Sequence, residues 1–180
     1  MPLILGEPET RTLEKLGKCN GVLFPGGNDD GYYDFGKFIY EAVKAYNDAG
    51  QFYPLMGLCQ GHENMAMYAS SFGKDVLDVL LAINVSLPLE FIDGVEAKLF
   101  DGLGNQKHLF EEFPVTQNFH QWAIKPEQFE IDEGLSSMFY PTSISYTTDT
   151  HEPFVATMES KNYPFYAVQF HPEKPVGKFT

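Results

Sequence analysis

The sequence predicts an α/β fold, a three-layer sandwich in which helices cover both faces of a mostly parallel central sheet. In the first half of the chain, short apolar runs alternate with segments of helical periodicity, and glycine or proline punctuates the junctions. Strands that alternate with helices require crossover connections, which produce parallel strands with helices on both faces. The 180 residues are 43% hydrophobic, which is enough for a sizeable core.

The predicted elements of the first half follow from apolar spacing and from turn residues. They are, in order, strand 3–5, helix 12–16, strand 21–24, helix 34–50, strand 52–58 and helix 60–70. The helix after Asp34 is the best supported, because its apolar residues recur at intervals of three and four. Asp34 is a suitable N-cap, and Gly50 is a suitable stop.

After residue 84 the pattern changes to short strand-like segments separated by turn residues. These segments are 116–119, 143–147, 153–159 and 165–170. No linker, internal repeat or low-complexity tract interrupts the chain. We therefore expect a single domain over residues 1–180.

Composition argues against several classes of partner. The net charge is −13 and no basic cluster is present, so nucleic acid is a poor candidate. The longest apolar stretches are far shorter than the roughly 20 residues that span a bilayer, and no signal peptide is visible at the start of this chain. Cys19 and Cys59 are too few for a disulfide framework and lack metal-ligand spacing.

Cys59 lies in the pattern Gly57-Leu58-Cys59-Gln60-Gly61, where a strand is expected to turn into a helix. This GxCxG pattern is the thiol version of a nucleophile elbow, in which small residues let the two backbones approach each other. The helix N-terminus is expected to lower the thiol pKa, and the Gln60 amide is placed to bind an oxyanion. A buried structural cysteine with incidental glycines is the alternative.

A base and its orienting group follow the last predicted strand. His171 comes directly after that strand, and Glu173 can accept the imidazole N–H. Ligand sites lie at the carboxyl ends of parallel strands, so His171 and Cys59 are expected to meet at one rim of the sheet. Pro25-Gly26-Gly27 also follows a strand, and Gly27 could supply a second oxyanion donor. The alternatives are a surface histidine and an ordinary tight turn.

These three motifs, PGG at 25–27, GxCxGxE at 57–63 and QFHPE at 169–173, resemble those of the class I glutamine amidotransferase-like superfamily. Within it, the chain is most similar to the γ-glutamyl hydrolase family. The further segments that carry this resemblance are SLPL at 86–89, NFHQW at 118–122 and YP at 163–164. The resemblance implies a flavodoxin-like fold and hydrolysis of γ-glutamyl bonds in folylpoly-γ-glutamates through a thioester, without a metal or cofactor.

The resemblance also implies a role for each matching residue. The catalytic residues would be Cys59, His171 and Glu173, the oxyanion donors Gly27 and Gln60, and the substrate-binding residues Glu63 and His120. Gln60 and His62 depart from the smaller or apolar residues expected there. Family members have a further strand and helix before residue 3 and a helix after residue 174, so the chain is expected to be truncated at both ends.

The implied partner is a small poly-γ-glutamyl compound, with a homodimer as an added expectation. The implied compartment is the lysosome, the vacuole or the extracellular space. Two other functions share these motifs: a glutaminase domain that feeds ammonia to a synthase, and an inactive protein that binds γ-glutamyl compounds. A metal site built from His120, His171 and Glu173 is disfavoured, because their spacing matches no recognised ligand pattern.

Overall fold

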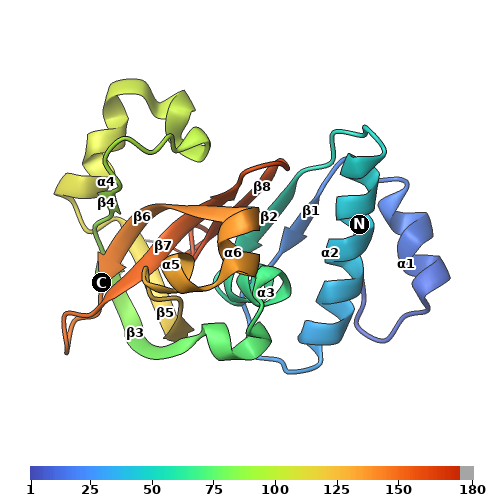
Figure 1. Cartoon of the computed structure of the whole chain (residues 1–180), viewed down its shortest axis with the longest axis horizontal. Helices are drawn as coiled ribbons and strands as arrows, with labels where there is room; N and C mark the ends of the chain where they lie inside the picture. Colours follow the sequence, from blue (N-terminus) through green and yellow to red (C-terminus); the bar gives the residue numbers. More distant parts are fainter. Residues whose placement is uncertain (175–180) are drawn as a thin grey trace.

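A six-stranded sheet forms the centre of the molecule in the computed structural model, which describes residues 1–174 (Figure 1). The strand order is β1-β2-β8-β7-β6-β4. The strands are β1 (Val22–Phe24), β2 (Leu55–Leu58), β4 (Glu90–Phe91), β6 (Phe139–Tyr146), β7 (Pro153–Ser160) and β8 (Phe165–Val168). A separate antiparallel ribbon pairs β3 (Asp78–Leu87) with β5 (Thr116–Ala123).

The α/β class is confirmed, but the sheet is mixed. β1, β2 and β8 run parallel, whereas β7, β6 and β4 are joined to β8 and to one another by antiparallel pairing. The prediction of a mostly parallel sheet therefore holds only for β1, β2 and β8, the half of the sheet whose strands lead into the candidate site residues. The antiparallel half arises because β6 and β7 are connected by a hairpin, which needs no crossover helix.

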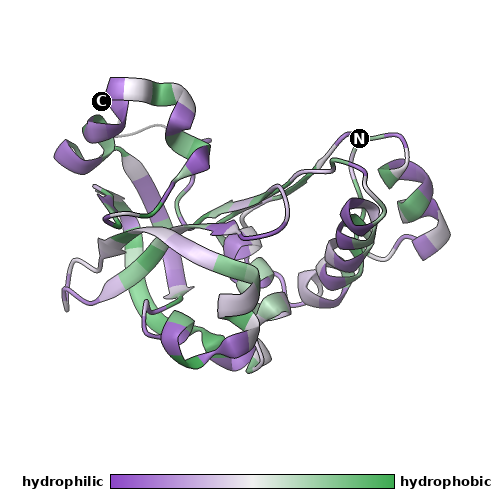
Figure 2. Ribbon diagram, turned by 45° about the horizontal axis from the view of Figure 1, so that its top comes forward, coloured by the Kyte–Doolittle hydropathy of each residue, from purple (hydrophilic) through white to green (hydrophobic). Residues whose placement is uncertain are grey.

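Most helices are short, and the two longest α-helices are α2 and α3. The helices are α1 (Glu9–Leu16), α2 (Tyr32–Asp48), α3 (Gln60–Ala69), η1 (Gly73–Val76), η2 (Lys98–His108), α4 (Leu109–Glu112), α5 (Gln128–Ile131) and α6 (Glu133–Met138). The buried residues of α2, Gly36, Ile39, Tyr40 and Val43, follow one another at helical spacing, while the turns of α2 visible in Figure 2 are mostly hydrophilic. Asp34 lies in the first turn of α2 rather than at its N-cap, which is Gly31, and Gly50 follows the helix with φ +85°.

Two apolar clusters cover the two faces of the sheet. One contains Phe24, Leu55 and Phe165 from the strands with Val43 and Met65 from α2 and α3. The other packs strand residues such as Phe154 and Val168 against Leu80 and Ala82 of β3 and Phe100 of η2. The second face is therefore covered by the helix η2 together with the β3–β5 ribbon, which the sequence did not predict as part of a layer.

The predicted strand from Leu3 to Leu5 is wrong. Ile4 and Leu5 are exposed, and residues 3–5 make no sheet pairing. The backbone N–H of Ile4 instead donates to the Glu7 side chain at 3.1 Å, and its carbonyl accepts from the Glu7 N–H at 3.0 Å. This turn satisfies both backbone groups of Ile4, and β1 is an edge strand of the sheet within residues 1–174.

The other predicted strands and helices are present, with ends that shift by a few residues. Across residues 1–174, no helix combines the length and the apolar character that crossing a membrane requires. α1 and α2 lie beside the β1 edge, and the β3–β5 ribbon lies toward the opposite edge (Figure 1). The candidate site residues lie between these regions, at the carboxyl ends of β2 and β8.

Candidate active site

Cys59 occupies a strained turn between β2 and α3. Its backbone has φ 49° and ψ −110°, in the left-handed half of φ space that residues with a Cβ rarely adopt. The flanking glycines make this turn possible. A Cβ on Gly57 would lie 2.8 Å from the Gly61 backbone, and a Cβ on Gly61 would lie 2.3 Å from the Phe24 carbonyl oxygen. The predicted elbow is therefore present, with strand and helix in close approach.

The Cys59 thiol is buried, and burial sets its protonation state. Desolvation, reinforced by the charge of Glu63, raises the pKa of Cys59 to about 12. The backbone N–H of Gln60 and the ammonium of Lys174 oppose this shift but do not outweigh it. The expected lowering of the thiol pKa at the helix N-terminus is therefore wrong for the free protein. The resting side chain is a thiol, so it requires a base for activation.

His171 is held by Glu173, as predicted for a base and its orienting group. The imidazole Nδ1 lies 2.7 Å from Glu173 Oε1. Although partial burial opposes the change, this hydrogen bond lowers the pKa of Glu173. The backbone N–H of His171 also donates to the Gln117 carbonyl at 2.8 Å, which fixes the residue against β5. A carboxylate on Nδ1 leaves Nε2 as the nitrogen that can exchange a proton with a thiol.

Gly26 contacts both of the residues expected to react. A Cβ at this position would lie 2.6 Å from His171 Cε1 and 3.3 Å from Cys59 Cβ. The imidazole and the thiol-bearing carbon therefore meet at the same loop residue, although they are far apart in the chain. Sequence reasoning assigned Gly27 in this loop and missed the contact made by Gly26. The PGG motif at residues 25–27 was the sequence feature that could have indicated this contact.

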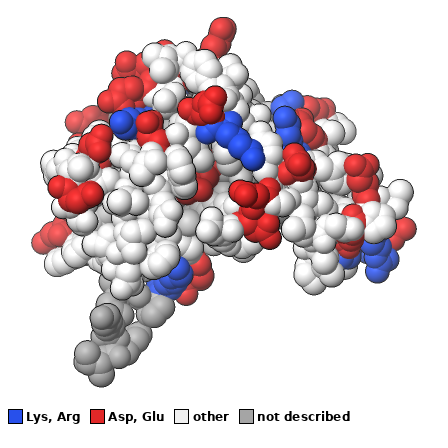
Figure 3. All heavy atoms as spheres, turned by 90° about the horizontal axis from the view of Figure 1, so that it is seen from below, with Lys and Arg blue, Asp and Glu red and all other residues white. Residues whose placement is uncertain are grey.

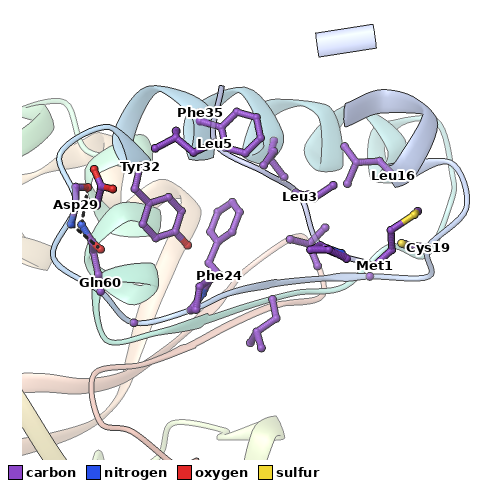
Figure 4. A pocket seen from close by; sticks show the side chains of 18 residues that line it. Met1, Leu3, Leu5, Leu16, Cys19, Phe24, Asp29, Tyr32, Phe35 and Gln60 are labelled. Carbon is purple, nitrogen blue, oxygen red and sulfur yellow. Dashed lines mark hydrogen bonds between the residues drawn. The ribbon is translucent and has the colours of Figure 1, made fainter. Parts of the chain in front are cut away.

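The Gln60 side chain fastens the glycine loop to the start of α3. Its Nε2 donates to the Asp29 carbonyl at 3.0 Å, and its Oε1 accepts from the Asp29 N–H at 3.4 Å (Figure 4). A Cβ on Gly27 would lie 2.6 Å from Gln60 Oε1. Gly27 and the Gln60 backbone are thus brought together beside Cys59. Their service as oxyanion donors stays a prediction.

Glu63 and His120 are both buried near the candidate nucleophile, Cys59. Glu63 Oε1 accepts from Gln169 Nε2 at 2.9 Å, and burial raises the pKa of Glu63 to about 7. Burial lowers the pKa of His120 to about 4, and its ring packs edge-on against Phe154 with centroids 4.9 Å apart. His120 therefore faces the second apolar cluster, and its contact with substrate stays a prediction.

His62 was noticed in the sequence only as a departure from the family pattern. It is completely buried, and burial lowers its pKa to about 3, an effect to which nearby His120 adds. Neither ring nitrogen of His62 or His120 has a hydrogen-bond partner among residues 1–174. Both rings are therefore neutral at physiological pH.

A cavity of about 630 Å³ lies along the free edge of β1 (Figure 4). Apolar side chains from the N-terminal segment, α1 and α2 line most of it, among them Leu3, Leu16 and Phe35. It reaches Gly26, Gly27 and Gln60 but is not lined by Cys59 or His171. This cavity therefore lies beside the residues expected to react but does not contain them. Within residues 1–174, no group of three or more His, Cys, Asp or Glu side chains is arranged to hold a metal ion.

Comparison with known proteins places these features in a family. The family model for class-I glutamine amidotransferases matches residues 6–179. The chain belongs to this family. A putative GMP synthase protein from Thermoplasma acidophilum has the same fold, with a TM-score of 0.53 and 18% sequence identity over 93% of this chain and 70% of that one.

Family members with higher identity are named as γ-glutamyl hydrolases. "Probable gamma-glutamyl hydrolase 3" from Arabidopsis thaliana is 37% identical over 180 residues, which cover 97% of this chain and 50% of that protein. "Gamma-glutamyl hydrolase" from Homo sapiens is 33% identical over 162 residues, which cover 86% of this chain and 49% of that protein. The predicted resemblance is confirmed. The chain spans about half the length of the curated relatives it matches.

Proposed function

We propose that this chain is the catalytic region of a cysteine-type γ-glutamyl hydrolase that acts on poly-γ-glutamyl tails, with folates as the carriers of those tails. The observation that carries the proposal is the meeting of Cys59 and His171 at Gly26, with Glu173 bound to the imidazole. The names of the relatives support the γ-glutamyl bond as the target.

In the first step, His171 removes the thiol proton as Cys59 Sγ attacks the γ-carbonyl carbon. A carbon–sulfur bond forms, and the backbone N–H groups of Gly27 and Gln60 stabilise the negative charge on the carbonyl oxygen. The carbon–nitrogen bond then breaks, and the leaving nitrogen takes the proton from His171. The Glu173 carboxylate stabilises the imidazolium that exists between these two events.

In the second step, water attacks the thioester while His171 accepts a proton from it. The carbon–sulfur bond breaks, and His171 returns its proton to the Cys59 thiolate. The γ-carboxylic acid leaves and loses its remaining proton to solvent. No metal or organic cofactor takes part in this scheme. Glu63 and His120 are proposed to lie beside the γ-glutamyl group. Burial raises the pKa of Glu63 and lowers the pKa of His120, so each side chain is populated in its neutral form near pH 7.

The acidic surface is compatible with this substrate only if local charge dominates near the site. Acidic side chains are spread over the face drawn in Figure 3, in line with the net charge of −13. Lys174 is the cation whose charge acts on Cys59. An encounter with a polyanionic tail is therefore expected to become faster as salt screens the acidic surface.

The test is release of glutamate from a di-γ-glutamyl folate by the purified chain, with Cys59→Ala as the control. Turnover by the parent and none by the variant is the expected result. Hydrolysis of free glutamine, with no action on the γ-glutamyl folate, would instead identify a glutaminase. Tight binding without turnover would identify an inactive γ-glutamyl-binding protein. The homodimer and the lysosomal, vacuolar or extracellular compartment stay predictions.

A further inference from the structure

His62 is a completely buried histidine whose ring makes no hydrogen bond within residues 1–174. Its exposed fraction is 0%, and both ring nitrogens are unpaired among these residues. A buried polar group without a hydrogen bond destabilises a folded protein, so a group of this kind in a native structure requires an explanation. The side chains beside His62 supply one.

Gln169, which directly follows β8, contacts both His62 and Glu63. Its Nε2 donates to Glu63 Oε1 at 2.9 Å, while its Oε1 is buried and has no partner among the described residues. The Gln169 amide also raises the pKa of His62, so the two side chains are neighbours, although their contact falls outside hydrogen-bond geometry. An unpaired amide oxygen and an unpaired ring N–H therefore lie close together.

The orientation of the Gln169 amide affects the ionisation of Glu63. With its NH2 group toward Glu63, the amide donates to the carboxylate and lowers the pKa of Glu63, which burial raises. With the amide reversed, its oxygen would face Glu63 and could accept a hydrogen bond only from the protonated carboxyl group. A group that fixes the amide therefore decides which form of Glu63 is favoured.

We propose that His62 is a positioning residue whose ring N–H donates to Gln169 Oε1 and thereby holds the amide NH2 group against the Glu63 carboxylate. A neutral imidazole has one N–H and one acceptor nitrogen, so one tautomer meets this requirement. The ionisation of Glu63 in turn acts on the candidate nucleophile, because the charge of Glu63 raises the pKa of Cys59. The effect of His62 on Glu63 stands without the proposed function, whereas its effect on hydrolysis rests on that function.

Glu63 is the member of this group of side chains that titrates near neutral pH. The pKa of Glu63 is about 7, whereas the pKa of His62 is about 3 and that of Cys59 is about 12. His120 of β5 lowers the pKa of His62 and has a pKa of about 4 itself. The other ionisable groups near the site follow β8: His171, Glu173 and Lys174. None of these three is among the groups that change the pKa of Glu63.

The experiment follows the side-chain carboxyl carbon of Glu63 by carbon NMR between pH 5 and 9, with Glu63→Gln to assign the signal. The parent should titrate near pH 7. His62→Phe removes the ring N–H from a side chain of similar size and should raise the midpoint by about one pH unit, the order of one hydrogen bond. His62→Gln keeps an N–H donor and should have a midpoint close to that of the parent. If His62→Phe does not fold, His62→Leu carries the same expectation.

Two further variants separate this role from a general effect of mutation. Asn64→Ala is the matched control, because Asn64 is also buried on α3 with an Nδ2 unpaired among residues 1–174, but it does not change the pKa of Glu63. It should leave the midpoint unchanged. In a Gln169→Met background, which lacks the amide, His62→Phe should cause no further rise. The role of His62 is overturned if His62→Phe keeps the midpoint of the parent, or if its effect persists without the Gln169 amide.

The same variants connect His62 to hydrolysis. With di-γ-glutamyl folate as substrate, the pH profile of kcat/KM in His62→Phe should move by the same amount as the Glu63 midpoint, and His62→Gln should return it toward the parent. A shifted midpoint with an unshifted profile overturns the role of His62 in the reaction and leaves the proposed function intact. Absence of hydrolysis by the parent overturns the proposed function, while the NMR titration still decides whether His62 acts on Glu63.

Discussion

Replacement of Gly26 by alanine isolates the contact that joins Cys59 and His171, the two residues proposed to react. Gly26 lies in a loop, and its φ is outside the range that excludes side chains, so the backbone itself accepts alanine. A new Cβ would lie 2.6 Å from His171 Cε1, whereas ordinary contact begins at 3.4 Å. The imidazole must therefore move by about 0.8 Å, or rotate away from Glu173.

A displacement of this size is expected to lower kcat about 100-fold, because proton transfer depends on the position of the imidazole. The effect on folding should be small. A loop alanine that fits its backbone restricts the unfolded chain and stabilises by roughly 0.4 to 1 kcal/mol, which offsets part of the strain at His171. A large loss of activity with little change in stability is the distinguishing result.

The assay measures kcat for γ-glutamyl hydrolysis alongside the thermal melt of each variant. Gly102→Ala is the matched control, because a Cβ there meets no atom within 4 Å and no positive φ is involved. It should keep both the activity and the melt of the parent. Activity of Gly26→Ala within about threefold of the parent, in a folded protein, would refute the idea that His171 acts from its observed position.

Three further predictions follow from buried titrating groups. The pKa of Glu63 is raised to about 7, so the folded protein loses stability as pH rises from 4.5 to 7. Glu63→Gln should therefore raise the free energy of unfolding at pH 8 by up to the order of 3 kcal/mol, and should not raise it at pH 4.5. Urea melts at the two pH values would measure this difference. A smaller gain at pH 8 than at pH 4.5 would contradict this. The Cys59 pKa of about 12 predicts that alkylation by iodoacetamide, corrected with Cys59→Ala for reaction at Cys19, rises about tenfold per pH unit from pH 7 to 10. An alkylation rate that levels off near pH 8 would show that the pKa of the Cys59 thiol is not raised. The same pKa shift predicts that the free energy of unfolding falls as pH rises above 9.

Local sequence was sufficient to predict the parts of the site that depend on neighbouring residues. The elbow at Cys59 follows from glycines two positions away on each side, because those positions must admit a second backbone. The pairing of His171 with Glu173 follows from their separation of two residues. The long helix α2 was predictable for a similar reason, since its apolar periodicity repeats over several turns.

Contacts between distant segments were decided only by the tertiary structure. The Leu3 to Leu5 segment is apolar enough for a strand, but Glu7 satisfies the backbone of Ile4 in a turn. The Cys59 pKa depends on burial and on Glu63, whereas the sequence displays only the helix N-terminus. Gly26 meets His171, and Phe119 meets Lys174, through loops whose course no local pattern specifies. The sequence thus determined which residues are proposed to react, because residue type and short-range spacing set local backbone geometry. The fold decided their protonation and neighbours, because burial is the sum of contacts from the whole chain.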